Sequence, residues 1–301
     1  MILDGGLATE LERNGADLTD ALWSARLLLD APEAIEAVHS AYYAAGAQCV
    51  TSASYQASYA GFAARGISEA DTTELLRRSV VLADRARARF SDRRLWVAAS
   101  VGPYGAVLHD GAEYLGDYGL GERELADWHR ARFGVLATAG ADVLACETIP
   151  TLVEARALVA LLREHPTARA WVSFSCRDGR HTSAGEPLRE AAELLDREPQ
   201  VVAVGVNCVP PHIVTECVRE IRGGTTKPIV VYPNSGEWWD ADARAWRGAA
   251  EGNRLADLAP EWVAAGASWI GGCCRTQPRD ISELASRWRP ADAGFLSSRS
   301  R

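Results

Sequence analysis

The sequence predicts a single (β/α)₈ barrel, an α/β fold in which eight parallel strands alternate with helices. Three observations support it: short apolar segments recur eight times along the 301 residues, helical patterns lie between them, and several helices end in the same tripeptide. We expect one barrel domain over residues 1–290, followed by a flexible C-terminal tail over residues 291–301.

The predicted strands are rich in Val, Ile and Ala and are apolar along nearly their whole length. This continuous apolar character is typical of parallel strands buried on both faces. A doubly wound open sheet is the alternative fold, but no strand is followed by a GxGxxG fingerprint, which favours the barrel. In chain order the predicted strands are 1–4, 48–54, 95–101, 142–148, 170–176, 201–208, 228–234 and 268–274.

The helices between these strands carry recognisable end patterns. Pro32 suits a first helical position and Gly46 a C-terminal stop, whereas Thr151 and Glu154 have the spacing of a capping box. The stretch 102–122 is rich in Gly and Tyr, has no periodic pattern and suits a lid or a pocket wall. A repeated "AGA" predicts a helix-to-strand turn with glycine in a left-handed cap, and it occurs at 45–47, 139–141 and 265–267.

Composition excludes several classes of function. The net charge of −8 argues against a nucleic-acid partner, because phosphate binding needs a basic patch. No apolar run approaches the roughly 18 residues that cross a membrane, and the N-terminus lacks the pattern of a secretory signal. Seven cysteines form an odd count without a small-scaffold pattern, so we expect free thiols and a cytoplasmic location.

Chemistry-bearing side chains stand at the ends of the predicted strands. In such a barrel the carboxyl ends of the strands meet at one mouth, where active sites lie. Cys208 ends one strand, and Cys273 and Cys274 end the last, so three thiols can meet there. Three cysteine sulfurs favour Zn²⁺ with an open fourth position. Gly271 and Gly272 allow a tight turn that points both sulfurs inward.

Other interpretations of these cysteines stay open. Cys273 and Cys274 can form a strained vicinal disulfide, or the cysteines can be inert core residues. A structural zinc with His212 as fourth ligand is a further alternative, although two prolines separate His212 from Cys208 and it suits the start of a helix. The remaining cysteines fall within apolar patterns and are expected to pack in the core: Cys49, Cys146, Cys176 and Cys217.

Four motifs together resemble the homocysteine S-methyltransferase family. They are "LDGGLATEL" at 3–11, "CETIP" at 146–150, "GVNC" at 205–208 and "GGCC" at 271–274. The family includes betaine–homocysteine methyltransferase, and the resemblance covers nearly the whole chain in the same order. It implies a (β/α)₈ barrel that holds zinc with Cys208, Cys273 and Cys274, and transfer of a methyl group to homocysteine.

The segment "YPNSGE" at 232–237 resembles the branch of this family that uses S-methylmethionine as methyl donor. The resemblance therefore implies that S-methylmethionine and homocysteine are the substrates and methionine the product. S-adenosylmethionine stays open as a second donor. The long C-terminal extension with which betaine enzymes form tetramers is missing, so a monomer is expected.

The resemblance also implies roles for individual residues. The homocysteine sulfur would take the fourth position on zinc, while the catalytic residues Asp4 and Glu147 hold the amino group of homocysteine. Trp238 and Trp239 offer a surface for a sulfonium, although such residues more often pack a loop. The expected substrate-binding residues are Gly5, Ser52, Asn207 and Gly272, with Tyr232, Asn234 and Glu237 in the donor pocket.

Three alternative functions remain at the level of sequence. Selenocysteine is a soft nucleophile like homocysteine, so a selenocysteine methyltransferase fits the same residues. A barrel lyase or hydrolase would use Asp4 and Glu147 as acid and base and keep a structural zinc. A zinc-sensing protein without catalysis is the third alternative.

Overall fold

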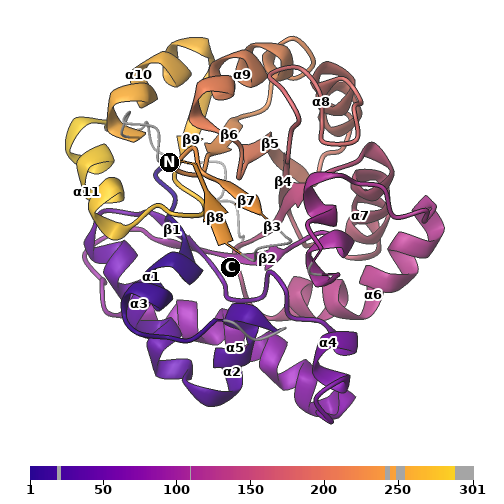
Figure 1. The fold of residues 1–301 in the computed structure, drawn as a ribbon, viewed down its shortest axis with the longest axis vertical. Helices are drawn as coiled ribbons and strands as arrows, with labels where there is room; N and C mark the ends of the chain where they lie inside the picture. Colours follow the sequence, from indigo (N-terminus) through magenta and orange to yellow (C-terminus); the bar gives the residue numbers. More distant parts are fainter. Residues whose placement is uncertain (19–21, 109, 241–244, 249–254, 289–301) are drawn as a thin grey trace.

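The computed structural model describes residues 1–18, 22–108, 110–240, 245–248 and 255–288. Its centre is a curled sheet of seven parallel strands in the order β1-β2-β3-β4-β5-β6-β9, and helices surround this sheet (Figure 1). The order follows the chain without the reversal that defines a doubly wound sheet, so the alternative fold is excluded. The predicted tail at 291–301 lies outside the described residues.

The seven strands of the sheet coincide with predicted apolar segments; most are shorter, whereas β3 and β9 each extend one residue beyond the prediction. The last strand stops at Ile270, so the Cys273–Cys274 pair lies in the turn that follows it and not within a strand. The strands are β1 (Cys49–Thr51), β2 (Trp96–Val101), β3 (Val143–Ile149), β4 (Ala170–Phe174), β5 (Val201–Asn207), β6 (Ile229–Tyr232) and β9 (Ala267–Ile270).

The first predicted strand, at 1–4, is reduced to two isolated parallel bridges. Ile2 pairs with Ile270 of β9, and Leu3 pairs with Cys49 of β1. Residues 2 and 3 thus join the two edge strands of the sheet. The prediction of a full strand at 1–4 is therefore wrong in extent, because Gly5 and Gly6 follow and the chain turns into helix α1 (Leu7–Arg13).

Helices follow most strands, as the alternation predicts, and the "AGA" turns have the expected backbone. Gly46, Gly140 and Gly266 have φ values of 107°, 95° and 125°, the left-handed conformation that glycine adopts without steric cost. The α-helices are α1 (Leu7–Arg13), α2 (Leu27–Asp30), α3 (Pro32–Ala44), α4 (Tyr59–Ala63), α5 (Glu69–Ala88), α6 (Glu122–Thr138), α7 (Leu152–Glu164), α8 (Leu188–Asp196), α9 (Val214–Arg222), α10 (Leu255–Ala265) and α11 (Pro278–Arg287).

The predicted capping box of α7 forms only in part. The hydroxyl of Thr151 accepts a hydrogen bond from the backbone N–H of Glu154 at 3.0 Å. The Glu154 side chain does not return to the cap. Instead its Oε1 lies 2.8 Å from Nε2 of His129 on α6 and accepts the backbone N–H of Tyr104 at 2.6 Å. Glu154 therefore ties the segment after β2 to two helices.

Two apolar clusters hold the fold together. The larger one lies between sheet and helices and includes Cys146 and Cys217. The smaller one gathers alternate strand residues, among them Cys49, and Trp171 packs there with its ring centroid 5.8 Å from that of Trp269. Three cysteines thus behave as core residues, as expected, whereas Cys176 is partly buried at the core's edge.

A short antiparallel hairpin was not predicted from the sequence. It pairs β7 (Trp238–Asp240) with β8 (Ala245–Arg247) after β6. The suggested sulfonium surface at Trp238 and Trp239 falls here, and their side chains lie outside the described part of the structure. Among the described helices, none combines the length and the apolar character needed to cross a membrane.

Candidate metal centre and substrate site

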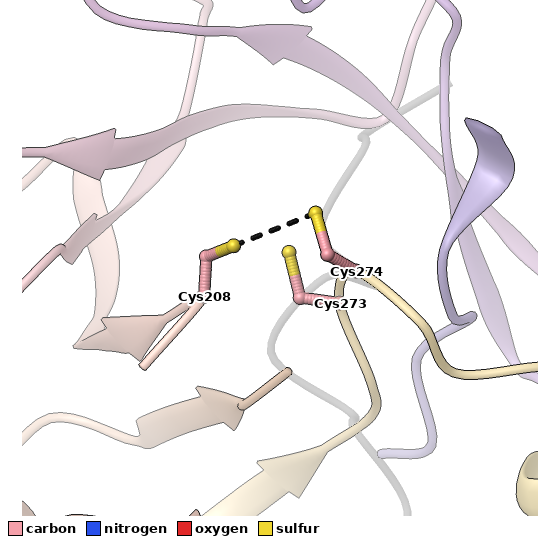
Figure 2. A group of neighbouring side chains, drawn as sticks. All are labelled: Cys208, Cys273 and Cys274. Atoms are coloured by element: carbon pink, nitrogen blue, oxygen red, sulfur yellow. Dashed lines mark hydrogen bonds between the residues drawn. The ribbon is translucent and has the colours of Figure 1, made fainter. Parts of the chain in front are cut away.

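Three thiols meet at the carboxyl end of the sheet. Cys208 follows β5, and Cys273 and Cys274 follow β9; their three sulfur atoms all lie within 4.8 Å of one another. The sulfurs point toward a common centre, with Sγ of Cys208 3.6 Å from Sγ of Cys274 (Figure 2). All seven cysteines of the chain are free thiols, so the vicinal disulfide does not form.

The backbone is shaped to bring these thiols together. Cys208 has a φ of 51°, a left-handed conformation that is rare for a residue with a side chain. Its N–H donates to the carbonyl of Tyr232 at 3.0 Å, and the N–H of Cys273 donates to the carbonyl of Pro233 at 2.7 Å. The last residue of β6 and the first residue after it therefore hold both cysteine-bearing segments in place.

The glycines before the cysteine pair are needed for close packing. A Cβ on Gly271 would lie 2.7 Å from the carbonyl oxygen of Asp4, and one on Gly272 would lie 2.7 Å from Cβ of Thr276. Gly5 faces the same threonine, where a Cβ would lie 2.8 Å from its Oγ1. Neither Gly271 nor Gly272 has a positive φ, so the tight turn predicted for them depends on the absence of side chains.

Two buried carboxylates flank the cysteines. Oδ2 of Asp4 accepts the N–H of Thr51 at 2.8 Å and its hydroxyl at 3.2 Å, while Glu147 accepts a hydrogen bond from Ser100 Oγ. Burial raises the pKa of Glu147 to about 7, and burial together with the nearby Glu147 charge raises the pKa of Asp4 well above its ordinary range. Neither carboxylate forms an ion pair within the described residues, so the pair suits a cationic ligand.

Asn207 and Tyr232 form a buried polar network beside the thiols. Oδ1 of Asn207 accepts hydrogen bonds from the Thr148 N–H and the Ser173 hydroxyl, each at 2.7 Å. Its Nδ2 donates to Thr148 Oγ1 at 2.8 Å and lies 4.0 Å from Sγ of Cys273. The Tyr232 hydroxyl lies 2.6 Å from Ser173 Oγ. These bonds hold β3, β4, β5 and β6 in register at the site.

The other expected binding residues are hydrogen-bonded to the segments around the site, and Ser52 and Asn234 are buried. Ser52 Oγ accepts the N–H of Ser100 at 3.1 Å and so links β1 to β2, while Thr51, one residue earlier, contacts Asp4. Asn234 Nδ2 donates to the Cys208 carbonyl at 3.5 Å. Oε2 of Glu237 accepts Arg275 Nε at 3.1 Å, so this carboxylate already has a cationic partner.

Sequence reasoning missed two residues of this site. The short 3₁₀ helix η3 (Ala112–Tyr114), in the Gly- and Tyr-rich stretch, places the hydroxyl of Tyr114 3.1 Å from Sγ of Cys208. Glu113, next to it, has a carboxyl oxygen that is buried without a hydrogen-bond partner among the described residues. The stretch was expected to form a lid or a pocket wall, but no periodicity indicated which of its side chains lie near the thiols.

The donor set fits a zinc ion. Within the described residues the cluster contains no fourth His, Cys, Asp or Glu ligand, and His212 lies exposed in the 3₁₀ helix η4 (Pro211–Ile213) that leads into α9. Hydrogen bonds from Cys273 and Cys274 hold the pKa of Cys208 well below its ordinary range, so the cluster already favours a thiolate. Three sulfurs at this spacing match a tetrahedral site with one position left for an exogenous ligand.

Comparison with known proteins shows the family of this chain. The family model described as homocysteine S-methyltransferase matches residues 1–288. The homocysteine S-methyltransferase of Bacillus subtilis (strain 168) is 49% identical over 294 residues, which cover 95% of this chain and 93% of that protein. The selenocysteine Se-methyltransferase of Brassica oleracea var. italica is 44% identical over 317 residues, with 99% and 92% covered.

A solved structure is equally similar. The crystal structure of the metallated form of the homocysteine methyltransferase from Escherichia coli superposes with a TM-score of 0.87 at 48% sequence identity, and the match covers 96% of each chain. The match of sequence and fold thus extends over almost the entire chain. This chain belongs to the homocysteine S-methyltransferase family.

Proposed function

We propose that the protein transfers a methyl group from S-methylmethionine to the sulfur of homocysteine and so forms methionine. The observation that carries this proposal is the meeting of three free thiols within 4.8 Å, flanked by the buried carboxylates of Asp4 and Glu147. The thiols suit a soft metal that binds sulfur, and the carboxylates suit the ammonium group of an amino acid.

We propose that Cys208, Cys273 and Cys274 hold a zinc ion. Bound zinc supplies an open coordination position and lowers the pKa of a thiol that binds there, which makes the thiol nucleophilic at neutral pH. The side-chain Nδ2 of Asn207 lies 4.0 Å from Sγ of Cys273. The buried hydrogen bonds that hold Asn207 would therefore also orient this sulfur toward the metal.

The chain's own residues would position the acceptor. Asp4 and Glu147 hold the ammonium of homocysteine, and their bonds to Thr51 and Ser100 fix the direction from which its sulfur approaches. The acceptor thiolate then attacks the methyl carbon of the sulfonium; a new sulfur–carbon bond forms as the old one breaks, and the donor leaves as a neutral thioether. The net result is transfer of a methyl cation and release of the acceptor thiol's proton to solvent, without redox change.

The donor assignment rests on the segment 232–237 and on charge. S-methylmethionine is a compact sulfonium, and the mouth is lined by acidic groups that attract a cation. Selenocysteine is a second candidate acceptor, because the Brassica relative carries that activity in its name at 44% identity. Homocysteine is the preferred acceptor because the family model and the Bacillus relative are both named for it.

Three further expectations belong to this proposal. The bridges of Ile2 to Ile270 and Leu3 to Cys49 would close the seven-stranded sheet into an eight-stranded barrel. Seven free thiols agree with a reducing cytoplasm. The expectation of a monomer stays a prediction, to be measured by sedimentation.

The test is an assay with each donor in turn. Purified zinc-loaded protein is mixed with homocysteine and S-methylmethionine, S-adenosylmethionine, betaine or methylfolate. We expect the highest kcat/KM with S-methylmethionine, no turnover with betaine or methylfolate, and two methionines formed per homocysteine consumed. Turnover with betaine at one methionine per homocysteine would contradict the donor assignment. Selenocysteine as the better acceptor would favour the second candidate.

A further inference from the structure

The helix η3 is held against the thiol cluster from two sides. The Ser175 hydroxyl, just beyond β4, donates to the carbonyl of Glu113 at 2.8 Å. On the other side, the Tyr114 hydroxyl lies 3.1 Å from Sγ of Cys208. A Cβ on Gly105 would lie 2.7 Å from the carbonyl carbon of Ala112, so this turn is also packed tightly against the preceding one. Glu113 is therefore held at the mouth.

The carboxylate of Glu113 has no countercharge among the described residues. The residue is partly exposed, yet its Oε2 is buried and accepts no hydrogen bond within that part of the chain. Burial raises the pKa of Glu113 to about 7, and the negative charge of Cys208 adds to this. The charge of Glu113 in turn raises the pKa of Cys274 and of Tyr55, so this carboxylate lies near the thiol cluster.

The other acidic groups of the site have different partners. Oε2 of Glu237, the expected donor-pocket residue, is paired with Arg275 at 3.1 Å and accepts the Ser235 hydroxyl at 2.7 Å. Asp4 and Glu147 act on each other and form one acidic pair beside the acceptor position. Glu113 comes from a separate loop, so the mouth offers a second, independent negative group.

We propose that Glu113 is a specificity-determining residue that binds the cationic part of the methyl donor at the mouth of the Cys208–Cys273–Cys274 cluster. This inference rests on the proposed function. A sulfonium donor that is also an amino acid brings two positive charges, and the homocysteine ammonium already engages Asp4 and Glu147. A carboxylate beside the thiols, with one buried oxygen that has no hydrogen-bond partner among the described residues, supplies the missing partner for the donor.

The test is Glu113→Gln in the zinc-loaded enzyme, with KM measured separately for each substrate. We expect the KM for S-methylmethionine to rise roughly 10- to 100-fold, because a hydrogen bond to a charged group is among the stronger ones. The KM for homocysteine and the zinc content should not change. Glu113→Asp should restore part of the donor affinity. Asp117→Asn is the matched control, because it removes the same charge from an exposed position of the same segment.

Inhibition by trimethylsulfonium, which carries a sulfonium but no ammonium, separates the two possible sources of the donor's charge. If Glu113→Gln weakens the binding of trimethylsulfonium and of S-methylmethionine equally, the sulfonium lies at Glu113. If it weakens the binding of S-methylmethionine alone, the ammonium lies there. An unchanged donor KM in Glu113→Gln, or equal rises in both substrate KM values, would overturn the inference. A wild-type protein that forms no methionine from any donor would instead overturn the proposed function.

Discussion

The phenol oxygen of Tyr114 lies 3.1 Å from Sγ of Cys208, so a loop that follows β2 touches a thiol that follows β5. With Cys208 as a thiolate, the hydroxyl donates to sulfur. Groups that hydrogen-bond to metal ligands typically change metal affinity by roughly 10- to 100-fold when they are removed. Tyr114→Phe should therefore release zinc about tenfold faster to a chelator, whereas Tyr59→Phe, whose hydroxyl lies 2.8 Å from Thr73 Oγ1, should not. Equal release rates in both variants and the wild type would argue against this hydrogen bond.

The cysteines themselves should decide metal content. Replacing Cys208, Cys273 or Cys274 by serine removes one of three sulfur atoms that lie within 4.8 Å of one another. We expect each of these variants to lose most of its zinc. Atomic absorption should find about one zinc per wild-type chain. Cys176→Ser, which changes a partly buried thiol outside the cluster, is the control and should keep its metal. Full zinc retention in Cys208→Ser and Cys273→Ser would rule the site out.

Glu147→Gln should impair use of homocysteine while leaving zinc bound. Removal of one partner from a buried charged hydrogen bond costs on the order of 2–4 kcal/mol, so kcat/KM for homocysteine should fall by that equivalent. Steady-state kinetics and metal analysis of the same preparation test this. Glu190→Gln, an exposed change on α8, should match wild type in both. If Glu147→Gln has wild-type kinetics, Glu147 serves the fold alone.

The raised pKa of Glu147 also predicts a pH dependence of stability. Burial moves this pKa from 4.5 to about 7, so the native state holds the proton more tightly than the unfolded state does. The free energy of unfolding should therefore fall as pH rises between these values. The amide introduced by Glu147→Gln stays neutral, so the stability of this variant relative to wild type should increase across this window by up to roughly 3 kcal/mol and then level off.

Urea unfolding of metal-free wild type and Glu147→Gln at pH 5, 6, 7 and 8 measures this difference. The metal-free form keeps proton release by zinc ligands out of the comparison. Glu190→Gln should show a constant difference from wild type. A difference that stays flat in Glu147→Gln would mean that the carboxyl has an ordinary pKa in solution.

Glu154→Ala should destabilise the protein strongly. The side chains of Glu154 and His129 are both 0% exposed and lie 2.8 Å apart, and Glu154 also accepts the N–H of Tyr104. Burial lowers the pKa of His129, so the ring is neutral, and the alanine leaves both this ring and the Tyr104 N–H without their acceptor. A buried group that loses its hydrogen-bond partner costs about 1–3 kcal/mol, a loss that urea unfolding can measure. Glu164→Ala removes an exposed ion-pair partner at the end of the same helix and should cost less than about 1 kcal/mol. Similar losses in the two variants would contradict this role.

The sequence predicted the sheet well because its strands are buried on both faces. Each of the seven strands lies within, or one residue beyond, a predicted apolar segment, since burial demands an apolar run. The meeting of Cys208 with the Cys273–Cys274 pair also followed from topology, because parallel strand ends converge. The length of the strand at 1–4 was overestimated, because an apolar run does not reveal how many of its residues form hydrogen bonds with a neighbouring strand.

Side chains on irregular segments could not be predicted in this way. Tyr114 and Glu113 reach the site through η3, whose fold depends on packing against Gly105 and Ser175 rather than on a periodic pattern. The capping box predicted at Thr151 and Glu154 depends on neighbouring residues alone. The bond to the Thr151 hydroxyl forms as predicted, but the Glu154 side chain does not bond back to the cap. A buried histidine on another helix attracts the glutamate, and no local pattern contains that information.

Among the described residues, three that carry side chains adopt positive φ angles, and all lie at the mouth: Thr148 at 61°, Cys208 at 51° and Arg275 at 67°. Each conformation costs on the order of 1 kcal/mol that glycine would avoid. Selection for thermal tolerance alone would therefore favour glycine at these positions and would delete a thiol at Cys208. A heat-stabilised descendant of this protein would be expected to lose catalytic function at the mouth first, while its sheet and helices remained intact.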